Sequence, residues 1–158
     1  MQIKELGHVV LGVRDLERSK RFYQDVLGLR NVAALHDIGL VFAGADGRSH
    51  HELLLLQANE ADAKAPSPET QGRLGLRHVA FRIGTTDAEL EAALAELKQA
   101  EATITDVVNH GDVTHSIYLK DPDGNTVEVY VDIDQAWRED PSYAGVMATG
   151  TRLLELKA

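Results

Sequence analysis

Apolar and polar positions in the first half of the chain follow first the period of a strand and then that of a helix. Residues 6–13 are mostly apolar and β-prone, and residues 16–27 carry apolar side chains at the spacing of one helical face. Asp15 is a good N-cap for that helix, and Gly28 suits the left-handed position after it. Three further apolar segments are typical of short strands: residues 30–35, 38–43 and 51–57. The first half therefore predicts the order β-α-β-β-β.

The second half repeats this order. Residues 76–83 predict a strand, and Thr85 or Thr86 caps a helix over residues 87–100. Three more strands are predicted at residues 103–108, 114–119 and 126–131. His8-Val9-Val10 opens one half, and His78-Val79-Ala80 opens the other. The repeat predicts an α+β fold of paired βαβββ modules, whose curved mixed sheets with flanking helices enclose a cavity.

The boundaries of these modules follow from the same pattern. We expect a first module at residues 5–58, a linker loop at 59–75, a second module at 76–132 and a C-terminal tail at 133–158. The linker is expected because residues 63–68 are polar and contain two prolines. The tail carries Trp137, Tyr143 and Leu153-Leu154, and could cover the cavity or another subunit.

Composition and charge restrict the partners. Apolar residues make up 44% and charged residues 26%, a globular balance. Sixteen basic against 25 acidic residues give a net charge of −9, so we expect no nucleic acid partner. No segment is long and apolar enough for a bilayer, and no targeting segment opens the chain, so we expect no membrane partner and a cytoplasmic location. Without cysteine, any metal must be held by histidine and carboxylate ligands.

Three residues are candidates for such a metal site. His8 and His78 hold equivalent positions in the two modules, and Glu128 lies on the last strand among β-prone residues, where an unpaired buried carboxylate would be costly. Taken singly, a strand histidine is more often a hydrogen-bonded core residue than a ligand. Together, two imidazoles and one carboxylate leave coordination positions open, as in non-haem Fe(II) oxygenases. We therefore predict one metal per chain.

The segment from Asn109 to Tyr130 carries a longer motif. It contains the turn Asp-Pro-Asp-Gly-Asn, with Glu128 three residues later, and the series His110, Tyr118, Glu128. This segment resembles the C-terminal signature of type I extradiol catechol dioxygenases, which belong to the vicinal oxygen chelate superfamily. The resemblance covers about residues 5–132. It implies Fe(II), or Mn(II) in some relatives, with an aromatic diol and O2 as substrates, and ring opening beside the two hydroxyls.

The resemblance also implies roles for residues around the metal. Tyr118 would hydrogen-bond a catechol oxygen, and His110 would bond the substrate oxygen and assist proton transfer. The family has a catalytic histidine at the start of the fourth strand of its metal-binding unit. His51 fits this position, with His50 as the alternative, and would stabilise negative charge developing on the oxygen. His115 is expected to be a surface residue of its strand.

Two other functions use the same fold. Glyoxalase I takes a fourth protein ligand, a glutamate on the last strand of the first module; here the only acid is Glu52, at the beginning of a leucine-rich segment. A non-catalytic drug-binding module would have no need for His8, His78 and Glu128 together. We therefore favour the extradiol dioxygenase, and we expect a homo-oligomer.

Overall fold

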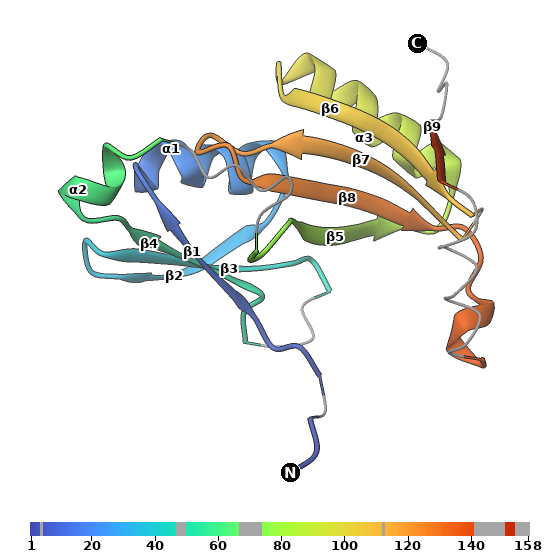
Figure 1. Ribbon diagram of the computed structural model, residues 1–158, viewed down its shortest axis with the longest axis horizontal. Coiled ribbons are helices and arrows are strands. Elements are labelled where there is room, and N and C mark those ends of the chain that lie inside the picture. Colours follow the sequence, from blue (N-terminus) through green and yellow to red (C-terminus); the bar gives the residue numbers. More distant parts are fainter. Residues whose placement is uncertain (4, 47–49, 67–73, 112, 141–150, 154–158) are drawn as a thin grey trace. The chain divides into compact units, whose positions relative to one another are not determined.

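The computed structural model (Figure 1) describes residues 1–3, 5–46, 50–66, 74–111, 113–140 and 151–153. The chain divides into two compact units, Met1–Ser67 and Pro68–Ala158. Each unit has its own sheet, so each is described by itself.

The first unit has a four-stranded sheet in the order β1-β4-β3-β2. Its elements are β1 (Val9–Val13), α1 (Leu16–Lys20), η1 (Arg21–Val26), β2 (Arg30–Leu35), β3 (Gly39–Ala43), β4 (Leu53–Gln57) and α2 (Glu60–Ala63). Strand β1 pairs with β4 in parallel, and the other pairs are antiparallel. The residues buried in this unit include Tyr23, Phe42 and Leu55.

The helix predicted for residues 16–27 changes type midway. After α1 the backbone continues as the π-helix η1, in which Leu27 N donates to Phe22 O, five residues earlier. Phe22 and Tyr23, adjacent in sequence, are both buried there, with their rings in an edge contact at 5.1 Å between centroids. The α-helical period predicted the buried residues but not this wider turn.

The second unit has the same order, β5-β8-β7-β6, with a fifth strand, β9, added beside β6. Its elements are β5 (Val79–Gly84), α3 (Asp87–Gln99), β6 (Thr103–His110), β7 (Thr114–Lys120), β8 (Thr126–Asp132), η2 (Ala136–Arg138) and β9 (Thr151–Leu153). Again the first strand pairs in parallel with the last strand of the repeat, β5 with β8. The predicted α+β fold and the repeat are confirmed.

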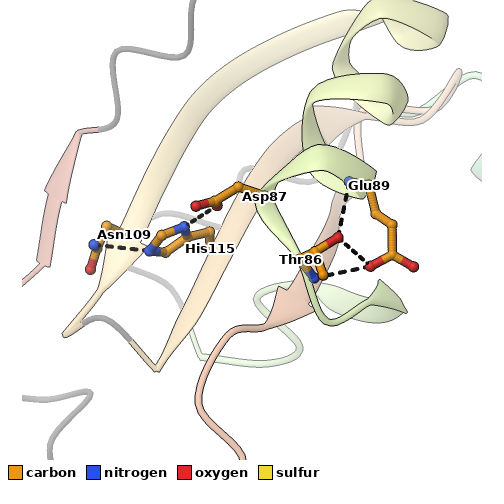
Figure 2. A network of polar contacts seen from close by, with 5 residues as sticks. All are labelled: Thr86, Asp87, Glu89, Asn109 and His115. Carbon is orange, nitrogen blue, oxygen red and sulfur yellow. Dashed lines mark hydrogen bonds and ion pairs between the residues drawn. The ribbon is translucent and has the colours of Figure 1, made fainter.

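Helix α3 begins with a capping box. Thr86 is the N-cap, and Glu89 N donates to its hydroxyl oxygen at 3.4 Å, while Thr86 N donates to Glu89 Oε2 at 3.0 Å. Both bonds are visible in Figure 2. Of the two predicted N-caps, Thr85 and Thr86, the structure has Thr86. Leu90, Leu94 and Leu97 are the buried residues of this helix.

Several boundaries differ from the sequence prediction. The strands predicted to begin at residues 6 and 76 begin at Val9 and Val79, so His8 and His78 directly precede them. The predicted linker loop contains the short helix α2. Within that loop residues 67–73 lie outside the described residues, as do Tyr143 and Leu154 of the tail. Among the described residues, no helix is long and apolar enough to cross a membrane.

Candidate metal centre

Glu128 is held within the sheet of the second unit. It lies on β8 opposite Tyr118 of β7 and Ala80 of β5. Its neighbours Val127 and Val129 are buried, and because side chains alternate along a strand, Glu128 points to the opposite face. The residue is itself 7% exposed, so its carboxylate needs partners.

His78 is one partner. It directly precedes β5, which pairs with β8, and its Nε2 lies 3.0 Å from Glu128 Oε2. The His78 side chain is 39% exposed and that of Glu128 10%. An imidazole nitrogen and a carboxylate oxygen at this separation are two donors that a divalent metal could share.

Ser116 is the other partner, and the sequence alone did not single it out. It lies two residues before Tyr118 on β7 and is fully buried, and its Oγ donates to Glu128 Oε1 at 2.5 Å. One carboxylate oxygen is thus fixed by Ser116 while the other faces His78. The alternation of residues 114, 116 and 118 could have placed Ser116 on this face, but only the strand register brings it to Glu128.

Tyr118 and His110 complete the cluster. A hydrogen bond of 3.0 Å joins His110 Nε2 and the Tyr118 hydroxyl, and the Tyr118 ring lies edge-on to His78 at 5.7 Å between centroids. Burial, and next the nearby Glu128 carboxylate, raise the pKa of Tyr118 well above its ordinary value. The phenol therefore keeps its proton at neutral pH.

A tight turn sets this arrangement. Asp121 Oδ1 accepts hydrogen bonds from Asp123 N at 2.9 Å and from Asn125 N at 2.8 Å, and Gly124 has a φ of +88°. Glycine adopts this left-handed conformation without steric cost. The turn joins β7 to β8 and fixes the register in which Tyr118 faces Glu128.

The predicted residues of the first unit form a histidine cluster of their own unit. The rings of His8 and His51 lie 4.4 Å apart between centroids, and those of His50 and His51 also 4.4 Å. The two Nδ1 atoms of His50 and His51 are in direct contact. Partial desolvation, followed by the neighbouring His8 and His50, lowers the pKa of His51. His8 and His51 thus lie together, while the His50 ring lies farther from His8, at 6.3 Å between centroids.

The donor chemistry of His78 and Glu128 fits a divalent metal, since an imidazole and a buried carboxylate are groups of the types that bind iron, manganese and zinc. Within the described ranges no group of three or more potential ligands is assembled. His8, the third predicted ligand, belongs to the first unit. The three-residue set therefore stays a prediction.

A cavity of about 280 Å³ begins at Glu128. Three β8 residues line it: Glu128, Tyr130 and Asp132. Ala80 and Thr114 of the flanking strands also contribute, together with Val113 and Trp137. Every lining residue belongs to the second unit.

His115 is not the surface residue that was expected. It is 8% exposed, its Nδ1 donates to Asp87 Oδ1 at 2.5 Å, and its Nε2 accepts from Asn109 Nδ2 at 3.0 Å (Figure 2). It alternates with Ser116 on β7 and so points to the other face of the sheet, where α3 provides Asp87. The expectation was wrong because it treated this face as open to water.

Comparison with known proteins identifies the class. Residues 5–129 match the family model described as the Glyoxalase/Bleomycin resistance protein/Dioxygenase superfamily. A structure described as a glyoxylase/bleomycin resistance protein/dioxygenase domain from Frankia sp. EAN1pec superposes with a TM-score of 0.67 at 20% identity, covering 83% of this chain and 99% of that one. The chain belongs to this superfamily.

The names of curated relatives are more specific than the description of the family model. A catechol-2,3-dioxygenase of Bacillus subtilis is 33% identical over 91% of this chain, and this chain spans 47% of that protein. A biphenyl-2,3-diol 1,2-dioxygenase of Rhodococcus globerulus is 33% identical over 89% of this chain and 73% of the relative. A lactoylglutathione lyase of Schizosaccharomyces pombe is 25% identical over 82% of this chain and 48% of its own length.

Proposed function

We propose that this protein is a metal-dependent extradiol dioxygenase that opens the ring of a catechol-type aromatic diol with O2. The observation that supports this most directly is the cluster of His78, Glu128, Tyr118 and His110 on one face of the second sheet. His78 and Glu128 are side chains of the types that bind metals. Beside them lie Tyr118 and His110, which can hydrogen-bond a phenolic oxygen. The relatives named as dioxygenases add support.

His8, His78 and Glu128 would hold one metal per chain, Fe(II) with Mn(II) as the alternative. Relatives named as an iron-dependent extradiol dioxygenase and as a manganese-dependent 2,3-dihydroxybiphenyl 1,2-dioxygenase are compatible with either ion. When bound, the ion would lower the pKa of the catechol hydroxyls and carry electron density between diol and oxygen.

The chain's own residues would position the diol and move protons. Tyr118, which keeps its proton, would donate a hydrogen bond to one catechol oxygen. His110 would bond the substrate oxygen and assist proton transfer, and its hydrogen bond with the Tyr118 hydroxyl places it beside that residue. His51 would stabilise the negative charge that develops on the oxygen, a role for which His50 is the alternative.

A glyoxalase I-type lyase is the second candidate, since relatives with that name also match. That reaction would need a glutamate on β4. In strand register, Leu54 pairs with Val10 in the first unit as Glu128 pairs with Ala80 in the second, so a leucine stands at the equivalent position. Glu52 accepts a hydrogen bond from Gly44 N at 2.9 Å and so has a structural role. A metal-free drug-binding module is the third candidate.

Metal content and oxygen consumption test the proposal. We expect one metal per chain, loss of that metal in His8→Ala, His78→Ala and Glu128→Ala, and oxygen uptake with a catechol that yields a coloured ring-opened product. Full metal content in all three variants would contradict the ligand set. Isomerisation of a glutathione hemithioacetal by Fe(II)-loaded protein, without oxygen uptake, would favour the lyase.

Variants beside the metal separate ligands from their neighbours. His51→Ala and Tyr118→Phe should lower turnover while metal content stays near one per chain. Loss of metal in either variant would mean that a ligand had been taken for a neighbour. The cytoplasmic location and the homo-oligomeric state remain part of the same proposal, and gel filtration at several concentrations tests the second.

A further inference from the structure

The cavity beside Glu128 extends away from the donor pair along β8. Glu128, Tyr130 and Asp132 all line it, and four residues of extended strand span about 13 Å. Its volume of about 280 Å³ lies just below the range of roughly 300–1,000 Å³ typical of drug-sized ligands. The space suits a small aromatic compound that has its diol at Glu128 and a substituent toward Asp132.

Trp137 reaches this cavity because the chain folds back after β8. Ile133 N and Asp134 N both donate to Val113 O, at 2.9 and 3.2 Å. Ala136 N then donates to Asp134 Oδ1 at 2.9 Å and begins the short helix η2, which carries Trp137. Backbone hydrogen bonds thus bring the indole beside Val113 in the cavity wall.

The indole is further held by its neighbour. The Arg138 guanidinium lies over the Trp137 ring, 4.6 Å from the centroid, and Arg138 Nε donates to Gln135 Oε1 at 2.8 Å. Trp137 also lies beyond residues 5–129, the part that matches the family model. This wall of the cavity is therefore contributed by a segment outside the region that defines the family.

The charge of the lining indicates which substituents the cavity accepts. Its charged lining residues are Glu128 and Asp132, and both are acidic. Asp132 is 4% exposed and forms an ion pair with Arg82, whose Nε lies 3.9 Å from Asp132 Oδ2 but which does not line the cavity. A carboxylate substituent would meet acidic groups as the charged part of the lining, whereas a neutral apolar group would meet Trp137, Val113 and Tyr130.

We propose that Trp137 is a specificity-determining residue, the wall of a subsite that selects diols with a neutral apolar or aryl substituent over carboxylated diols. This inference rests on the proposed function for the position of the diol at Glu128. The subsite itself is defined by the cavity and its lining, so its occupation can be measured apart from catalysis.

Fluorescence tests occupation, because Trp137 is the only tryptophan in the chain. The full chain, with Fe(II) and without oxygen, is titrated with nitrocatechol, which absorbs where tryptophan emits, and with biphenyl-2,3-diol as a competitor. We expect saturable quenching that the competitor reverses. Quenching that rises linearly without saturation would overturn the proposal.

Specificity is tested with three substrates: catechol, biphenyl-2,3-diol and protocatechuate, which carries a carboxylate. Wild type should favour the biphenyl diol over protocatechuate. Trp137→Ala should change the ratio of kcat/KM for biphenyl diol and catechol about tenfold or more, the usual effect of altering an apolar pocket, and Trp137→Phe should change it less. Glu139→Gln, an exposed neighbour outside the lining, is the matched control. Preference for protocatechuate, or unchanged ratios in Trp137→Ala, would overturn the proposal.

The two proposals fail in different ways. Saturable quenching without oxygen uptake for any diol would leave the subsite standing and reject the dioxygenase. Oxygen uptake with unchanged kcat/KM ratios in both Trp137 variants would support the dioxygenase and reject the subsite.

Discussion

In the second unit the residue in register with Ala80 is Glu128, whereas in the first unit the residue in register with Val10 is Leu54. Both strands begin directly after a histidine, His78 in one unit and His8 in the other. The same strand order thus presents a histidine and a carboxylate in one unit, and a histidine beside a leucine in the other. A repeated fold does not require repeated chemistry, because single side chains on an unchanged backbone decide which unit supplies the carboxylate.

The faces that the helices cover differ as well. In the first unit Phe22, Tyr23 and Phe42 pack together, with 6.5 Å between the ring centroids of Tyr23 and Phe42. In the second unit the helix buries leucines, and the same unit also has polar contacts of His115 with Asp87 and Asn109. The second unit therefore holds buried polar groups on both faces of its sheet, and each of these groups depends on a specific partner.

The largest effect is expected from making the first unit resemble the second. Leu54→Glu should leave metal bound but lower oxygen uptake with catechol about 100-fold, because an extra carboxylate would displace the diol from its position. Metal analysis and oxygen-electrode rates on the same sample measure both effects. Leu54→Gln is the control of matched size. Undiminished turnover in Leu54→Glu would show that Leu54 does not face the reacting groups.

A smaller effect is expected at Ser116, which lies in the second unit. Ser116→Ala removes the donor to Glu128 Oε1 and should weaken metal binding about 10–100-fold, the usual result of deleting a group that orients a ligand. Competition with a chelator measures the affinity. Ser116→Thr retains the hydroxyl and should recover most of it. Equal affinities in the alanine variant and wild type would reject a positioning role.

The polar contacts behind the sheet should affect stability alone. His115→Ala removes the hydrogen bonds that His115 makes with buried Asn109 and with Asp87. It should lower the free energy of unfolding by about 1–3 kcal/mol. Urea denaturation measures it. Asp87→Asn, at a side chain that is 53% exposed, should have a smaller effect. A loss of metal in His115→Ala would mean that the two faces of β7 are coupled.

The smallest effect is expected at the start of α3. Thr86→Ala should lower stability by about 1 kcal/mol, as loss of an N-cap does. Hydrogen bonds from Thr85 and Thr86 lower the pKa of Glu89, so its contribution is present above the carboxyl's ordinary pKa and is lost as pH falls through the lowered one. Glu89→Gln should thus be less stable than wild type at neutral pH, with a difference that shrinks in acid. A difference that is constant with pH would contradict this.

Much of the fold could be predicted because its signals are local. The apolar periods and the turn at residues 121–125 lie within short segments, and the two orders of elements were evident from them. The proximity of Tyr118 and Glu128 could also have been predicted from spacing, since one tight turn joins their strands.

What the sequence did not reveal depends on contacts between distant segments. Ser116 lies beside Glu128 only through the register of β7 and β8, and serine has no distinctive spacing of its own. His115 was taken for a surface residue because Asp87, far away along the chain, supplies its partner. The π-helix η1 was missed because a single extra residue per turn hardly alters the apolar pattern.

Gly84, at the end of β5, has a consequence for how this sequence can vary. A β-carbon built there would overlap the Glu89 carboxyl group, with Oε1 only 2.6 Å away. The space that a side chain would need is already filled by the carboxyl group that accepts from Thr85 and Thr86. Positions 84 and 89 are therefore expected to covary among homologues: a residue larger than glycine at the first should accompany loss of glutamate at the second.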